Sequence, residues 1–213
     1  MDELVERGYW ICRTRIYLHG KSEIVAKLMT PTGRDERQYY CGEGEDRVFI
    51  QSPRQTKPYG VDLKLTFMVN PKHRLVDNYA TYTGFSLFSK RLVDLVREFG
   101  VKFETFPVRM VDKGENELKD MEYYVFHLLE PNLDAMDKQK SKWVDFDKGI
   151  PILVLDLDNF EHRPMFVCND VFLTLMRDDL RNEISRRGIT GFSFLDPALY
   201  QSGEFGFAED YGD

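Results

Sequence analysis

One unit occurs twice in this chain, roughly eighty residues apart: a helix cap, an amphipathic helix, a glycine and a short strand. In the first copy, Ser89 is a residue type that caps helix N-termini, and residues 90–99 repeat apolar side chains at helical spacing. Gly100 suits the left-handed conformation that ends a helix. Residues 101–105 then read as a strand. The unit is a structural framework without a visible active site, which favours a binding function over a catalytic one.

The second copy has the same order with a longer apolar pattern. Asn169 is its expected cap, residues 170–187 its helix, Gly188 its end and residues 189–194 its strand. The expected apolar stripe of this helix is Phe172, Leu175, Met176 and Leu180. Helix–glycine–strand is also a common connection. The sequence therefore leaves open whether the two copies form a structural repeat or arise by coincidence.

Strands account for most of the remaining pattern, and residues 123–129, apolar on both faces, are typical of a strand at the centre of a sheet. Residues 112–120 form a charged turn between two strands. Together these patterns predict an α+β fold with a mixed, largely antiparallel sheet and two main amphipathic helices. The further expected elements are strands over residues 9–18, 61–68 and 152–157 and a short helix over 22–29.

No linker rich in Pro, Gly or Ser divides the chain, which favours a single domain over residues 1–213. A subdivided chain would have an N-terminal strand-and-loop part over residues 1–75 and a core over residues 86–197. Residues 203–213 would follow as an acidic, aromatic tail. The N-terminus has no apolar signal segment, and no apolar run approaches the ~20 residues that span a bilayer. We therefore expect a cytoplasmic protein without membrane contact.

The net charge of −7 is distributed unevenly. Residues 1–100 hold 16 Lys+Arg against 13 Asp+Glu, whereas residues 101–213 hold 13 against 23. An acidic half disfavours nucleic-acid binding, which requires cations to neutralise phosphates. It is typical either of a soluble surface or of a protein that meets a basic protein partner.

Few residues indicate chemistry. Asp156 and Asp158 lie two apart at the end of an apolar strand, where they would either hold a divalent cation or, more simply, form a turn. His127 lies within an expected strand and is predicted to be a hydrogen-bonded core histidine. The three cysteines, Cys12, Cys41 and Cys168, are too widely spaced for a zinc site and odd in number, which disfavours a disulfide framework. No catalytic residue and no cofactor are predicted.

The tail combines carboxylates with aromatic side chains and contains no basic residue. Aromatic side chains supply desolvated anchors at interfaces, and acids steer a basic partner. A terminus that contacts nothing is the simpler interpretation. The candidate partner-binding residues are Asp156 and Asp158 together with Glu204, Phe205, Phe207, Glu209, Asp210 and Tyr211.

About half of the chain, residues 87–197, resembles a family of bacterial immunity proteins that accompany polymorphic toxins, first catalogued as a domain of unknown function with a myxobacterial type member. The aromatic strand at 123–129 and the Asp–Lys–Ser stretch at 133–141 carry the resemblance. So do the segment 165–170 before the second helix and the closing Gly-hydrophobic-x-Gly-x-x-Phe at 188–194.

The resemblance implies a small cytoplasmic protein that binds one cognate toxin and neutralises it without catalysis. The expected partner is a toxin with a basic surface, and neither nucleic acid nor membrane is expected to bind. Two other classes stay open. One is an enzyme, either a divalent-metal hydrolase or one that reverses a toxin's covalent modification. The other is an adaptor domain associated with a secretion system.

Overall fold

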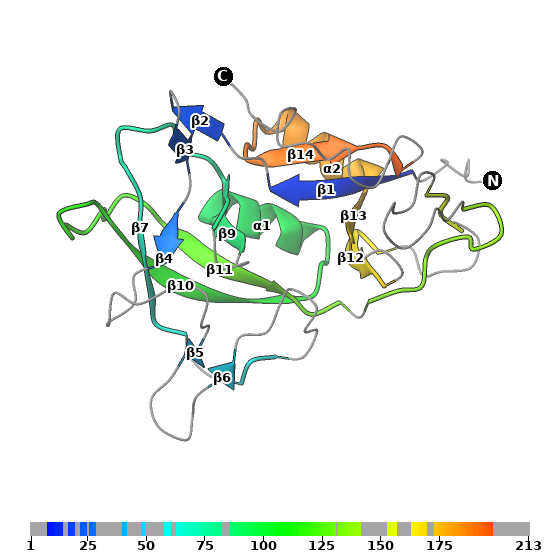
Figure 1. Ribbon diagram of the computed structural model, residues 1–213, viewed down its shortest axis with the longest axis horizontal. Helices are drawn as coiled ribbons and strands as arrows, with labels where there is room; N and C mark the ends of the chain where they lie inside the picture. The colour runs from blue at the N-terminus through cyan, green and yellow to red at the C-terminus, as the bar shows by residue number, and fades with distance from the viewer. Residues whose placement is uncertain are drawn as a thin grey trace.

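The computed structural model describes residues 8–14, 17–19, 22–24, 26–28, 40–41, 48–49, 58–60, 63–81, 86–130, 132–141, 153–156, 163–169 and 173–197. Two helices and two main sheets, both mostly antiparallel, make up this part of the chain (Figure 1). The predicted α+β class is confirmed.

The larger sheet has six strands in the order β4-β7-β10-β11-β9-β8. Adjacent strands of this sheet are antiparallel except for β7 and β10, which run parallel to each other. The sheet is therefore mixed, as predicted. β11 lies between β10 and β9, which confirms the central strand expected near residues 123–129. The strands are β4 (Lys27–Leu28), β7 (Leu65–Met68), β8 (Asn78–Tyr79), β9 (Ser86–Ser89), β10 (Phe103–Val111) and β11 (Tyr123–Leu128).

The smaller sheet has four antiparallel strands in the order β12-β13-β1-β14. One of its two inner strands, β1, comes from the N-terminal part of the chain, whereas the other three strands come from the C-terminal part. The strands are β1 (Tyr9–Thr14), β12 (Met165–Cys168), β13 (Leu173–Arg177) and β14 (Phe192–Leu195). Two short ribbons pair β2 (Tyr17–His19) with β3 (Ser22–Ile24) and β5 (Tyr40–Cys41) with β6 (Val48–Phe49).

The two sheets contain the same arrangement of strands and helix, so the two segments that are similar in sequence form a structural repeat. In the first unit β8 and β9 lead directly into α1 (Lys90–Glu98), and β10 follows the helix. In the second unit β12 and β13 lead directly into α2 (Asp178–Arg186), and β14 follows. A fourth strand separates the strand before the helix from the strand after it: β11 in the first unit and β1 in the second. The units therefore share spatial order but differ in which part of the chain supplies that strand.

Both helices end in the same way. The backbone N–H of Gly100 donates to Arg97 (3.0 Å) and that of Val101 to Val96 (3.2 Å). At the same relative positions Gly188 donates to Ser185 (3.1 Å) and Ile189 to Ile184 (3.0 Å). Both glycines have positive φ, 73° and 60°, as residues after a helix often require. The two stop glycines predicted from the sequence are confirmed.

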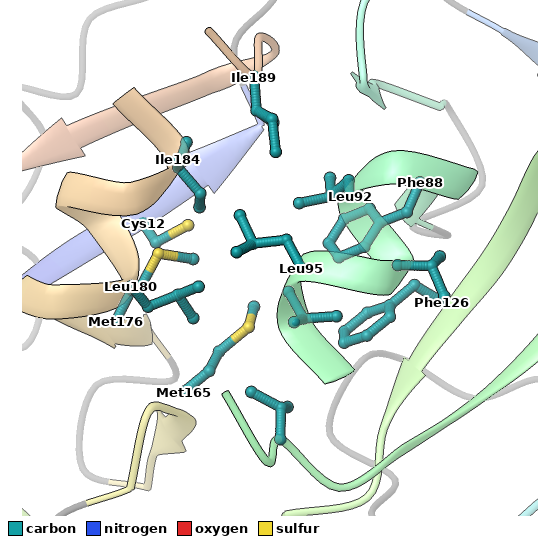
Figure 2. Packing of buried hydrophobic residues seen from close by; sticks show 13 residues of the cluster. Cys12, Phe88, Leu92, Leu95, Phe126, Met165, Met176, Leu180, Ile184 and Ile189 are labelled. Atoms are coloured by element: carbon teal, nitrogen blue, oxygen red, sulfur yellow. The ribbon is translucent and has the colours of Figure 1, made fainter. Parts of the chain in front are cut away.

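The helices bury their apolar sides in one shared cluster. α1 lies on β9 and β11, and α2 lies on β13 and β1. Figure 2 shows Leu92 and Leu95 of α1 facing Leu180 and Ile184 of α2. Each of these four side chains is at most 1% exposed. Fully burying a leucine contributes about 1.5–3 kcal/mol, so this cluster is a main attachment between the two sheets.

Two predicted helical regions are wrong. Residues 173–177, expected inside the second helix, form β13, and α2 begins only at Asp178. Leu175 and Met176 are both buried because a strand between two packed layers is apolar on both faces. The short helix expected over residues 22–29 is replaced by β3 and β4.

Candidate functional site

Asp77 is a buried carboxylate, 5% exposed, that joins three elements. Ser89, the N-cap of α1, donates its hydroxyl to Asp77 (2.7 Å). Arg91 donates to both carboxylate oxygens (2.5 and 2.6 Å), and the backbone N–H of Thr190 donates at 2.9 Å. Asp77 therefore links the loop before β8, the first turn of α1 and the loop before β14, so it connects the two repeated units.

The charge of Asp77 is stabilised by these donors. Burial alone would raise the pKa of this carboxyl, but the hydrogen bonds from Arg91, Ser89 and Thr190 outweigh it and hold the pKa below its ordinary value. The folded state consequently binds fewer protons than the unfolded state at mildly acidic pH. The contribution to stability is complete above the unfolded pKa of about 3.9 and is lost as the pH falls through the lower folded-state pKa.

Gly191 and Asn78 form a second connection between the units. The Asn78 side chain donates to the Gly191 carbonyl (3.1 Å), and its backbone N–H donates to Thr190 (3.2 Å). Gly191 has φ +95°, and a Cβ there would overlap the backbone of Asn78. Only glycine lets the chain pass this close.

His127 is buried, 4% exposed, and hydrogen-bonded, as the sequence predicted. Its Nδ1 lies 2.7 Å from Glu104 Oε1, and its ring stacks on Tyr59 at a centroid distance of 4.1 Å. The backbone N–H of Tyr59 donates to the same Glu104 oxygen (2.8 Å). These contacts fix the segment around Tyr59 against β10 and β11. Structural packing explains the arrangement.

Acidic side chains are concentrated in the turn between β10 and β11, residues 112–122, which we name the acidic hairpin. It projects from one end of the six-stranded sheet (Figure 1). Two lysines, Lys113 and Lys119, offset part of its charge. Its five carboxylates are Asp112, Glu115, Glu117, Asp120 and Glu122.

Hydrogen bonds within the acidic hairpin fix its shape. Asp112 Oδ1 accepts from the backbone N–H groups of Gly114 (2.7 Å) and Asn116 (2.9 Å). These bonds hold the pKa of Asp112 below its ordinary value, with the Asn116 side chain as the largest cause. Glu115 has φ +62°, so its side chain is presented from a left-handed backbone position. A carboxylate held in place loses less conformational entropy on binding than one on a loose turn.

Leu75 lies in the loop that follows β7, at the same end of the sheet. It is 52% exposed, and no other large hydrophobic side chain of the described residues is classed as exposed. The backbone N–H of Val69 donates to Val111 (2.9 Å), so this loop starts beside the start of the acidic hairpin. Tyr123, which follows the hairpin, donates its hydroxyl to Val76 (2.7 Å). The sheet end therefore combines an exposed apolar side chain with several carboxylates.

Of the residues predicted to bind a partner, the structure describes only Asp156. It is half-buried, and its backbone N–H donates to Ala135 (2.9 Å), beside the bridge between Met136 and Leu155. Asp158 and the tail residues Glu204, Phe205, Phe207, Glu209, Asp210 and Tyr211 lie outside the described residues, so their roles stay predictions.

Within the described ranges, no group of three or more His, Cys, Asp or Glu side chains could hold a metal ion. Cys12 and Cys168 are buried cysteines, and burial raises the pKa of the Cys12 thiol. Neither of the two helices is long and apolar enough to cross a membrane.

The sequence reading recognised residues 112–120 as a charged turn but missed them as a candidate site. The signal was present, since five of the eleven residues from 112 to 122 carry a carboxylate. What the sequence could not supply was Leu75, which the topology brings to the same end of the sheet.

A scan of protein-family models finds no match to this chain, and a search of curated proteins finds no significant match.

Proposed function

We propose that this chain is an immunity protein that binds and neutralises a cognate bacterial toxin by direct contact, with no chemical step. The acidic hairpin beside Leu75 is the observation that carries the proposal. Protein–protein interfaces commonly have apolar side chains at their centre and polar or charged groups around them. The family resemblance of residues 87–197 points to the same function.

The charge of the surface determines which partner it suits. Five carboxylates against two lysines in the acidic hairpin attract a basic surface, and the net charge of −7 adds to the long-range field. Such a field speeds encounter and weakens as salt screens it. The occluded toxin surface would therefore be basic, with an apolar recess for Leu75.

The buried polar groups support a binding function. Asp77, His127 and the buried Glu130 each bond to a residue of another element, Glu130 through Arg163 (2.5 Å). They hold the fold in one geometry. Such rigidity preserves the shape of an exposed surface, and a preorganised surface binds more tightly.

Calorimetric titration with an inactivated form of the toxin encoded beside this chain tests the proposal. We expect one-to-one binding in the nanomolar range that weakens as salt is added. Glu117→Lys should weaken binding by about tenfold or more, because it replaces attraction by repulsion. Leu75→Ser should weaken binding without lowering Tm, since the side chain is exposed.

Lys119→Glu is the matched control, because it changes charge in the same turn with the opposite sign. It should leave binding unchanged or tighten it. Absence of any complex with the wild-type chain at micromolar concentration would refute the proposed function. Equal affinities for the wild type, Glu117→Lys and Leu75→Ser would remove the acidic hairpin from the interface.

A further inference from the structure

Arg181 of α2 stacks on an aromatic surface and has no acidic partner among the residues that the structure describes. Its guanidinium carbon lies 3.8 Å from the ring centroid of Trp10 and 5.7 Å from that of Phe194. Its charged group donates a hydrogen bond to a neutral acceptor, Asn182 Oδ1, at 3.3 Å. Arg181 Nε is enclosed, and no described residue provides it with a hydrogen-bond acceptor.

The surroundings of Arg181 hold it in place. The Trp10 indole N–H donates to Asp178, at the start of α2, which fixes the ring beneath the guanidinium. Phe194 stacks on Phe192 at 5.7 Å, which extends the aromatic surface along β14. Trp10, Arg181 and Phe194 are all half-buried, so part of each side chain remains accessible to solvent.

Other arginines of the two helices are matched with carboxylates. Arg91 pairs with Asp77 (2.5 Å), Arg97 with Asp94 (2.9 Å), and Arg186 and Arg187 both with Glu183 (2.5 and 2.6 Å). Arg181 differs from these four, because no carboxylate in the described part of the chain compensates its positive charge. A half-buried cation without an anion is costly in the free protein.

The first repeated unit shows which residue types occupy the positions equivalent to Arg181 and Trp10. Arg181 is the fourth residue of α2, and the fourth residue of α1 is Val93, which is 3% exposed in the shared cluster. Trp10 is the second residue of β1, and Tyr124 is the second residue of β11. The first unit therefore fills the position with an apolar side chain, so the arginine of the second unit is not required by the fold.

We infer that Arg181, stacked on Trp10 and flanked by Phe194, is the contact site for a carboxylate side chain of the toxin; this inference rests on the proposed function. The ring holds the planar guanidinium, whose free N–H groups suit a carboxylate. Arg and Trp are the residue types that most often dominate interface energetics.

The site also supplies specificity that the overall charge cannot. A chain with a net charge of −7 attracts any basic protein. A fixed cation that requires a carboxylate rejects basic proteins that lack an acid at that position, because binding them would bury Arg181 unpaired. The cognate toxin would therefore carry an acidic side chain within its otherwise basic contact surface.

Titration of the inactivated neighbouring toxin into Arg181→Met tests the site. We expect the Kd to rise by about tenfold or more, whereas Tm stays the same or increases, since methionine fills the position without an unpaired charge. Arg181→Lys keeps the charge but loses the planar guanidinium. Its Kd should lie between those of the wild type and Arg181→Met. The separation of affinity from stability distinguishes this site from a structural contact.

Arg97→Met is the matched control. Arg97 also lies over an aromatic ring, Phe103 at 5.5 Å, but is already paired with Asp94. Its loss should leave the Kd unchanged. If the wild type binds and Arg181→Met binds equally tightly, this inference alone is overturned. A Tm of Arg181→Met several degrees below that of the wild type would also overturn it. Absence of any wild-type complex would overturn the proposed function and this inference together.

Discussion

At the scale of single residues, the buried polar groups differ in whether the sequence predicts their role. Asp77 and Asn78 are neighbours in sequence, and both bond across to the loop before β14. Nothing near them in sequence announces these partners, because Thr190 and Gly191 are more than a hundred positions away. His127, by contrast, was predicted correctly, since a histidine within an apolar strand needs a buried partner.

Asp77→Ala is expected to lower the free energy of unfolding by about 2–3 kcal/mol, because it removes a buried acceptor of several hydrogen bonds. The value lies below that of a fully buried pair, since the Arg91 side chain is 58% exposed and stays solvated. Urea unfolding at pH 7 measures it. Asp94→Ala, which removes only exposed pairs, should change stability little.

The pH dependence of the Asp77 contribution gives a second check. Because the folded-state pKa of Asp77 is lowered, its stabilising effect is present at neutral pH and lost as the pH falls below about 4. The difference in Tm between the wild type and Asp77→Ala should therefore shrink in acid. A difference that stays constant from pH 7 to pH 3 would contradict the assigned cause.

At the scale of elements, stop glycines are predictable and strand-to-helix junctions are not. Gly100 and Gly188 mark helix ends because few other residues adopt their backbone conformation easily. The start of α2 has no such signal: its N-cap is Arg177, which makes no side-chain capping bond. A buried strand that runs straight into a helix gives one continuous apolar pattern. The sequence could not divide it.

Leu180→Ala tests how much the apolar cluster between α1 and α2 contributes to stability. Leu180 is fully buried between α2 and the residues of α1, so its truncation leaves a cavity. We expect a loss of about 2–5 kcal/mol in the free energy of unfolding, measured in urea. Leu75→Ala removes the same atoms from an exposed site and should be nearly neutral. Similar losses for both variants would show that the cluster is not tightly packed.

At the scale of the whole molecule, the repeat explains an unusual chain path. In the first unit β10 and β11 follow one another through the acidic hairpin, whereas the second unit takes its matching strand, β1, from the other end of the chain. The sequence predicted a strand near residues 9–18 but could not say where it pairs. Pairing across more than a hundred and fifty residues leaves no local signature.

A permuted chain would test this description. Leu195 pairs with Ile11 and Phe192 with Thr14, so a short Gly-Ser linker can join Pro197 to Gly8 as a hairpin. A chain that begins at residue 17 and ends with residues 8–14 should therefore fold with a similar Tm, measured by circular dichroism. The same chain without residues 8–14 should lose the four-stranded sheet. If both chains melt alike, β1 does not hold the sheet together.

The position of β1 also affects how the chain emerges during synthesis. β1 is made before the other described strands, whereas both of its neighbours, β13 and β14, are made more than a hundred and fifty residues later. At about 5–20 residues per second, the nascent strand waits on the order of ten seconds for either one. The six-stranded sheet can close on the ribosome while Ile11 and Cys12 still lack their covering strands. A strand that is translated before all the other described strands is thus among the last to become native.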